Sequence, residues 1–280
     1  MSSKRPRLSN RTRPRTVRSR VGSARAGRLL ALGVLFAAAG CASPRGAPAS
    51  HLEALRALDA EPPASRAIAA LDRLKLLALP QGALLPGCAV PLVVFEPGYR
   101  AMVEDALAGD RLLAVAMLAP GAERDPEARP KLRPTACLAM LEDAETLPGG
   151  RFRIAVRGLL RIRIAGEPRT DRPYREVVAQ IDDEEPEADS RDLQTLHRSV
   201  SQLWGLLPRP RRQALLAAST AGLDPGNLCD AMAAAVLDEP EELQSILETF
   251  EVRARVRRLT GLVGGRLLSV QPRPYDGLLS

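Results

Sequence analysis

The sequence predicts an α+β protein, in which a β-rich region comes first along the chain and a helical region follows. Between residues 75 and 182, short apolar runs are separated by Pro and Gly, as in a series of strands and turns. After residue 182 the apolar residues recur at intervals of three and four, as they do on one face of a helix. Because only 3% of the residues are aromatic while 45% are hydrophobic, Leu, Val and Ile must provide most of the core packing.

The β-rich region, residues 75–182, contains seven expected strands. They are Lys75–Leu79, Ala89–Phe95, Leu112–Leu118, Ala136–Leu141, Arg151–Val156, Leu160–Ile164 and Arg175–Ile181. One helix is expected at about residues 98–107, and residues 121–134 read as a charged loop. Leu147-Pro148-Gly149-Gly150 predicts a hairpin turn, because glycine adopts the positive φ angles that such turns need.

The helical region, residues 183–265, follows an acidic stretch at residues 182–189 that we expect to be a surface loop. Its first helix should end before Pro208, and Glu241 and Glu242 should begin a later one, since carboxylates are favourable at the positive N-terminal end of a helix. The expected apolar faces are Leu193, Leu196, Val200, Leu203 and Leu207, then Leu228, Met232, Ala235 and Val236, then Leu243, Ile246, Leu247 and Phe250, and finally Val252, Val256, Leu259 and Val263. Residues 266–280 read as a tail.

The first fifty residues differ from the rest in charge. They contain eleven Lys or Arg and no Asp or Glu, and subtracting this +11 from the +7 of the whole chain leaves −4 for residues 51–280. Within this basic leader, the apolar run Leu29–Ala39 is too short to span a bilayer but suits the core of a signal peptide.

Gly40 and Cys41 follow the apolar run directly, and the sequence Ala-Ala-Gly-Cys resembles a bacterial lipobox. It predicts that Cys41 is lipidated and that residues 51–74 link a membrane anchor to the folded body. The alternative is a misassigned gene start, in which case the protein is cytoplasmic and, without the lipid anchor, does not associate with a membrane.

Several kinds of site are excluded by spacing. Four Cys and two His are too scattered to form a zinc site, and Cys88, Cys137 and Cys229 are expected to be small apolar core residues. No Lys follows a Gly-rich phosphate loop, and neither a G-x-S-x-G elbow nor an H-E-x-x-H motif is present. We therefore expect no catalytic residues, no metal and no cofactor. The acidic body also argues against a nucleic-acid partner, because affinity for phosphates comes from Lys and Arg.

The segment from Leu85 to Val103, LPGCAVPLVVFEPGYRAMV, resembles the opening motif of the Lon protease N-terminal domain family. The residues in step with that motif are Pro86, Gly87, Pro91, Leu92, Phe95, Glu96, Tyr99, Arg100 and Met102. Val90 and Gly98 depart from it, standing where Leu and Arg are common.

Further blocks resemble the same family in the same order. Residues 135–141 (TACLAML) and 156–164 (VRGLLRIRI), with Gly158 and Arg161, are similar to its next strands. Residues 243–255 are similar to a helix of its second half, with Glu251 in place of the usual Asp. The resemblance covers about residues 75–265.

This resemblance implies a PUA-like β pseudo-barrel followed by a C-terminal helical bundle. It also implies a stand-alone substrate-binding domain that binds unfolded or tagged proteins or peptides, without the ATPase and protease of Lon. Such a domain would act as an adaptor in protein quality control, in partnership with a separate ATP-dependent protease. Two alternatives stay open: a PUA-like domain that binds RNA, and a module that binds a small ligand.

The motif has a mainly structural reading. Phe95 should end a buried strand against the core, and Tyr99 and Met102 should face the core from the following helix. Glu96 and Arg100 lie four residues apart and can pair on that helix. Arg161 and Arg163 alternate on one strand and are expected to be solvated or paired with carboxylates.

Overall fold

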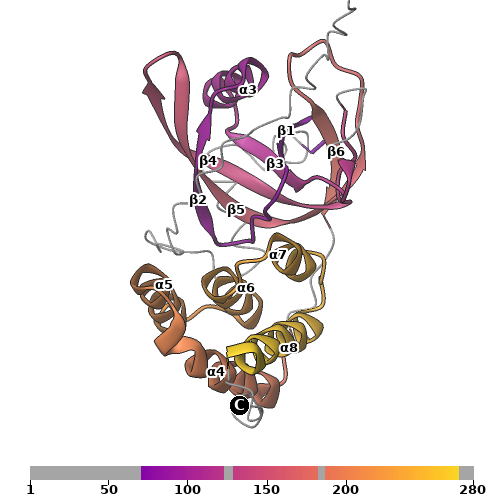
Figure 1. Ribbon diagram of the computed structural model, residues 1–280. Coiled ribbons are helices and arrows are strands. Elements are labelled where there is room, and N and C mark those ends of the chain that lie inside the picture. Colours follow the sequence, from indigo (N-terminus) through magenta and orange to yellow (C-terminus); the bar gives the residue numbers. More distant parts are fainter. Residues whose placement is uncertain (1–70, 123–128, 182–186, 271–280) are drawn as a thin grey trace, which may run out of the picture.

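The computed structural model describes residues 71–122, 129–181 and 187–270, and its strands and helices occupy opposite ends of the molecule (Figure 1). Within these residues, six strands and one helix come first, and five further α-helices follow from Ser190 onward. The α+β prediction is confirmed. Figure 1 also shows α6 and α7 nearest the strands, with α8 and α4 farther from them.

The strands form one sheet that closes on itself. They are β1 (Leu74–Leu79), β2 (Ala89–Val94), β3 (Leu112–Met117), β4 (Thr135–Leu147), β5 (Arg151–Gly166) and β6 (Glu176–Ile181). Their order is β2-β5-β4-β3-β1-β6, and an additional pairing of β5 with β6 completes a ring of five strands. β1 and β3 are parallel, whereas the other pairs are antiparallel. This closed ring, with β2 added outside it, is the pseudo-barrel.

The expected strands at residues 151–156 and 160–164 are in fact one continuous strand, β5. Its first half pairs with β2 and its second half with β6, so a single strand serves two neighbours on the same side. The expected break falls at Gly158, where the loop before β2 crosses β5. There the Gly87 N–H donates to the Gly158 carbonyl and the Gly158 N–H donates to the Cys88 carbonyl, both at 2.9 Å. The pairing of β4 with β5 shifts register between Leu138 and Ala139, which leaves Leu159 of β5 as an extra residue without a partner in β4. The Gly158 region is therefore a crossing point and not a turn.

Alternate residues of the strands divide the core into two clusters. One cluster takes residues from all five strands of the ring, as the inside of a barrel must, including Leu76, Ala114 and Val177. The other takes the opposite faces of β1, β3, β4 and β5, for example Leu77, and joins them to β2, α3 and the helical bundle. The period of two in the strands thus lets one sheet pack against two partners.

The helices are α3 (Pro97–Ala108), α4 (Ser190–Leu203), α5 (Arg209–Thr220), α6 (Pro225–Val236), α7 (Pro240–Leu247) and α8 (Val252–Val270). Asp189 and Asp224 cap α4 and α6 by accepting hydrogen bonds from backbone N–H groups. The expectation of one helix up to Leu207 is wrong, because α4 ends at Leu203 and a 3₁₀ turn, η2 (Trp204–Leu206), follows. The apolar spacing did not predict α5, whose buried face consists of Ala214, Leu215 and Ala218.

Along the three described stretches, none of the helices has both the length and the apolar character of a membrane span.

Candidate functional site

Most of the motif residues build the junction between β2 and α3. Leu92 and Met102 are buried in the core, and Pro86 is buried in the loop before β2. Pro91 lies within β2, opposite Ala155 of β5. The prediction for Phe95 is wrong: it is 36% exposed, because it follows the last residue of β2 and its side chain has left the buried face. The motif is thus largely structural, except at its centre.

Glu96 and Arg100 form no ion pair with each other within the described chain. The Arg100 Nη1 donates instead to the Gly149 carbonyl in the β4–β5 turn, at 3.3 Å. Glu96 precedes α3, but its carboxylate caps none of the helix N–H groups. Partial burial raises the pKa of Glu96 above its usual value. The expected pair is therefore absent, and the Glu96 carboxylate is left facing a pocket.

Arg161 is paired with a carboxylate, one of the two environments expected for it, and it is buried. Only 1% of its side chain is exposed, and it donates two hydrogen bonds to Asp230 of α6, at 2.8 and 2.6 Å. Arg255 of α8, also buried, donates to the same carboxylate at 3.3 Å. The Arg161 Nε donates to the Leu247 carbonyl at the end of α7. The alternative of pairing with a carboxylate holds for Arg161, whereas solvation does not.

This Arg161–Asp230–Arg255 triad joins the barrel to the bundle. A second connection lies beside it, where the Gln244 amide of α7 donates to the Thr135 carbonyl at 3.1 Å. Sequence reasoning missed Asp230, although a lone carboxylate within the apolar run LCDAMAAAV was a usable signal for a buried ion pair. Arg163, two residues beyond Arg161, is exposed and lies over the Phe250 ring at 4.4 Å.

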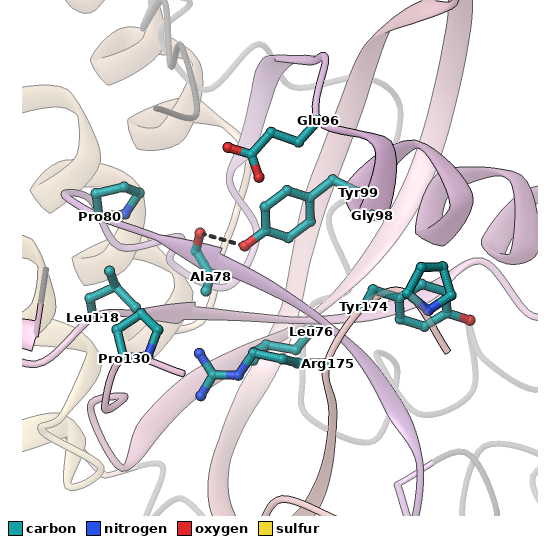
Figure 2. Close-up of a pocket in the computed structure, with 11 residues that line it drawn as sticks. Leu76, Ala78, Pro80, Glu96, Gly98, Tyr99, Leu118, Pro130, Tyr174 and Arg175 are labelled. Carbon is teal, nitrogen blue, oxygen red and sulfur yellow. Dashed lines mark hydrogen bonds between the residues drawn. The ribbon is translucent and has the colours of Figure 1, made fainter. Parts of the chain in front are cut away.

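A pocket of about 150 Å³ lies between β1, the start of α3 and the segment that leads into β6 (Figure 2). Its lining residues are Leu76, Ala78, Pro80, Glu96, Gly98, Tyr99, Leu118, Pro130, Pro173, Tyr174 and Arg175. Most of them are apolar or aromatic. Sequence reasoning found Glu96 and Tyr99 as motif residues but did not place them in a pocket, since its walls come from four segments that meet only in the fold.

Close packing fixes the start of α3 beside this pocket. A Cβ atom at Gly98 would lie 2.5 Å from the Pro173 carbonyl oxygen, so only glycine allows this approach. Figure 2 shows the Tyr99 ring between Glu96 and β1, and its hydroxyl donates to the Ala78 carbonyl at 3.4 Å. Burial and the neighbouring Glu96 raise the pKa of Tyr99 to about 12, so this hydroxyl stays protonated at neutral pH.

The other side of the pocket is held by an ion pair and a hydrogen bond to residues outside it. Arg175 donates two hydrogen bonds to Glu167, at 2.9 and 2.6 Å. The Tyr174 hydroxyl donates to Asp105 at 2.6 Å, and both burial and this carboxylate raise its pKa. These contacts fix the segment before β6 and neutralise the charge of Arg175.

The wall formed by β1 has a backbone edge that no other strand covers at Ala78, although the Ala78 carbonyl accepts from the Tyr99 hydroxyl. β6 pairs only with Leu74 and Lys75, and the next N–H, that of Leu76, donates to the Arg175 carbonyl at 2.9 Å. Because Leu79 directs its carbonyl to β3, the polar groups of Ala78 point the opposite way, toward the pocket. Among the described residues no strand pairs with this side of β1 beyond Leu76. Ala78 is only 6% exposed, so this edge is reached through the pocket. A strand edge that no other strand covers can pair with another extended chain.

The cysteines offer no reactive group at this pocket. Cys88, Cys137 and Cys229 are buried and form no disulfide, as small apolar core residues are expected to be. Burial raises the pKa of Cys137 to about 12. In the part of the chain that the structure covers, no cluster of three His, Cys, Asp or Glu could hold a metal ion. Cys41, the predicted lipidation site, lies outside the described residues.

Comparison with known proteins identifies the family. A family model described as the ATP-dependent protease La (LON) substrate-binding domain matches residues 73–264, more than half of the chain. The chain belongs to the Lon substrate-binding domain family. The resemblance of the motifs to the Lon N-terminal domain is therefore confirmed.

Lon proteases are similar to this chain over the same region. The Lon protease of Desulfosudis oleivorans is 28% identical over 193 residues, which cover 68% of this chain and 23% of the relative. That of Roseiflexus castenholzii is 32% identical over 192 residues, covering 66% of this chain and 23% of the relative. The chain thus spans about a quarter of the length of these curated relatives. The family model that matches it is that of the substrate-binding domain.

A solved structure shows the same fold. The N-terminal domain of the Mycobacterium avium complex Lon protease superposes with a TM-score of 0.53 at 19% identity, covering 69% of this chain and 98% of that domain. Both the barrel and the bundle of this chain are therefore parts of one Lon N-terminal fold. A substrate-binding role follows from the family match.

Proposed function

We propose that this Lon-type domain binds unfolded or tagged polypeptide segments in an extended form, by pairing them with the free edge of β1 beside the pocket. The single observation that carries the proposal is the edge itself: the Ala78 N–H points into an apolar pocket, and β6 stops pairing with β1 at Lys75, three residues earlier. Main-chain hydrogen bonds to an edge are largely independent of sequence, which suits a domain that must accept many unfolded chains.

We expect this binding to involve neither catalysis nor nucleotide. Two features support this: the pocket holds no nucleophile beside a general base, and the chain lacks a phosphate-binding loop. The domain would then act as an adaptor, passing bound polypeptide to a separate ATP-dependent protease. Addition of the protein to a purified Lon protease should speed the degradation of an unfolded substrate, and no effect at saturating protein would refute the adaptor role.

The direct test is fluorescence anisotropy with a reduced, carboxymethylated protein that cannot fold. The full chain should bind it without ATP and should not bind the same protein in its native state. A short extended peptide should compete, whereas the same peptide with alternate backbone amides N-methylated should not, because it cannot pair with β1. Absence of binding to the unfolded protein, together with tight binding to single-stranded RNA, would refute the proposal in favour of an RNA-binding module.

We also propose that Cys41 is lipidated and tethers the domain to a membrane. The support is the sequence alone, namely the apolar run Leu29–Ala39 followed by Gly40 and Cys41. Membrane fractionation should place the wild-type protein in the membrane and Cys41→Ser in a soluble fraction. Recovery of both in the cytoplasm with residues 1–40 retained would refute it.

A further inference from the structure

The charges around the pocket are not balanced. Glu96 is the acidic group that lines it, and within the described residues neither a basic side chain nor a helix N–H group pairs with its carboxylate. Arg175 is the basic group that lines it, but its charge is already matched by two hydrogen bonds to Glu167. Arg129 and Lys131 flank Pro130, but both are exposed and neither lines the pocket. The pocket therefore presents a net negative charge at Glu96.

The start of α3 does not reverse this sign. A helix N-terminus carries about half a positive charge, and this would by itself favour an anion. The Glu96 carboxylate carries a full negative charge at the same place, so the sum remains negative. An acidic side chain or a phosphate group would meet this carboxylate directly, whereas a cation would be attracted to it.

The walls fit the stem of a basic side chain. Lys and Arg carry several methylene groups that pack on apolar surfaces while the charge lies at the end. Leu118, Pro80 and the Tyr99 ring supply such surfaces, and in Figure 2 the Glu96 carboxylate lies on the far side of Tyr99 from Arg175. An aromatic face next to a carboxylate is a favourable place for a cation. The volume of about 150 Å³ suits one side chain and not a folded surface.

We infer that this pocket is a specificity subsite for one Lys or Arg side chain of the bound polypeptide, with its charge beside Glu96 and its stem against Tyr99. The inference rests on the proposed function, because the polypeptide lies along the β1 edge that forms one wall of the pocket. It adds a preference: extended segments with a basic residue bind more tightly than segments without one.

The test uses the full chain and labelled peptides of about ten residues, identical except for one central residue. That residue is Lys, norleucine, which keeps the stem without the charge, or Glu. The Lys peptide should bind roughly three- to fivefold more tightly than the norleucine peptide, as expected for a partly exposed ion pair, and the Glu peptide should bind most weakly. The preference should shrink as salt is raised.

Glu96→Gln should remove the preference for Lys, so that the Lys and norleucine peptides bind with similar affinity. Glu104→Gln is the matched control, since it makes the same change of charge on the exposed face of α3 and should keep the preference. Equal urea midpoints will show that both variants are folded. A Lys preference that survives Glu96→Gln, or its absence in the wild type, overturns the inference.

The two proposals fail in different ways. If carboxymethylated protein binds but the Lys peptide has no advantage, or no short peptide binds at all, the basic subsite is wrong and the proposed function stands. If the carboxymethylated protein does not bind either, the proposed function itself is wrong.

Discussion

Replacing Asp230 should destabilise this protein more than replacing any single partner of the buried triad. Asp230 is 1% exposed and lies between two guanidinium groups that are themselves 1% and 0% exposed. Asp230→Ala would remove the carboxylate that Arg161 and Arg255 share, while both guanidinium groups stay buried. Breaking a buried ion pair in this way costs about 3–5 kcal/mol, because the remaining charge stays desolvated.

Arg161→Met should cost less, about 1–3 kcal/mol. It removes the two hydrogen bonds to Asp230 and the one to Leu247, but Arg255 still neutralises the carboxylate. Arg153→Met, on the same strand, is the matched control. Arg153 pairs with Glu145 on the surface, where both side chains are 57% exposed, so the loss should stay below about 1 kcal/mol.

Urea unfolding followed by far-UV circular dichroism and by the fluorescence of Trp204, the single tryptophan, measures these costs. The expected order of destabilisation is Asp230→Ala, then Arg161→Met, then Arg153→Met. A loss for Asp230→Ala no larger than that for Arg161→Met would refute the reasoning, since it would mean that the two arginines do not need their counter-charge.

Three further outcomes follow from the packing and the pKa values. Phe95→Ala should lower the free energy of unfolding by less than about 1 kcal/mol, whereas Leu92→Ala in the same segment should lower it by about 2–5 kcal/mol, both measured in urea. Gly158→Ala should cost at least about 1–3 kcal/mol, because its Cβ would lie 2.4 Å from the Leu85 carbonyl oxygen; a stable variant would show that the crossing can move. Since the pKa of Cys137 is about 12 in the folded protein against 9.0 ordinarily, its contribution to stability is complete below pH 9 and is lost as the pH rises, by about 1.4 kcal/mol per pH unit. Cys137→Ala should therefore reduce the fall in urea midpoint between pH 9 and 11, and an unchanged slope would contradict this.

The order of strands and then helices could be predicted from the sequence, because the apolar period depends only on local geometry. Side chains alternate along a strand and recur every three to four residues along a helix. The hairpin turn at Gly149 and Gly150, both with positive φ, could be predicted for the same reason. The helix α5 could not, since two of its three buried residues, Ala214 and Ala218, are alanines and its apolar pattern is correspondingly weak.

The burial and the partners of single residues could not be predicted in the same way. Phe95 reads as the last apolar residue of a buried strand, yet whether the end of a strand is covered depends on what packs over it. For Arg161 the sequence left open whether the side chain is solvated or paired with a carboxylate. The carboxylate that pairs with it and makes its burial tolerable lies 69 residues away in the sequence. No local pattern carries that information.

The sequence by itself determined the fold class, the family and the absence of a phosphate-binding loop or a known catalytic motif, because each of these is recognised from residue types and their spacing within short segments. Only the tertiary structure decided where a polypeptide could bind. The pocket joins β1, α3, the chain after β3 and the segment before β6, and the free edge exists because β6 leaves β1 after two pairs. Both depend on contacts between residues far apart in the chain. Local spacing does not show which distant segments come into contact, because that depends on how the whole chain packs.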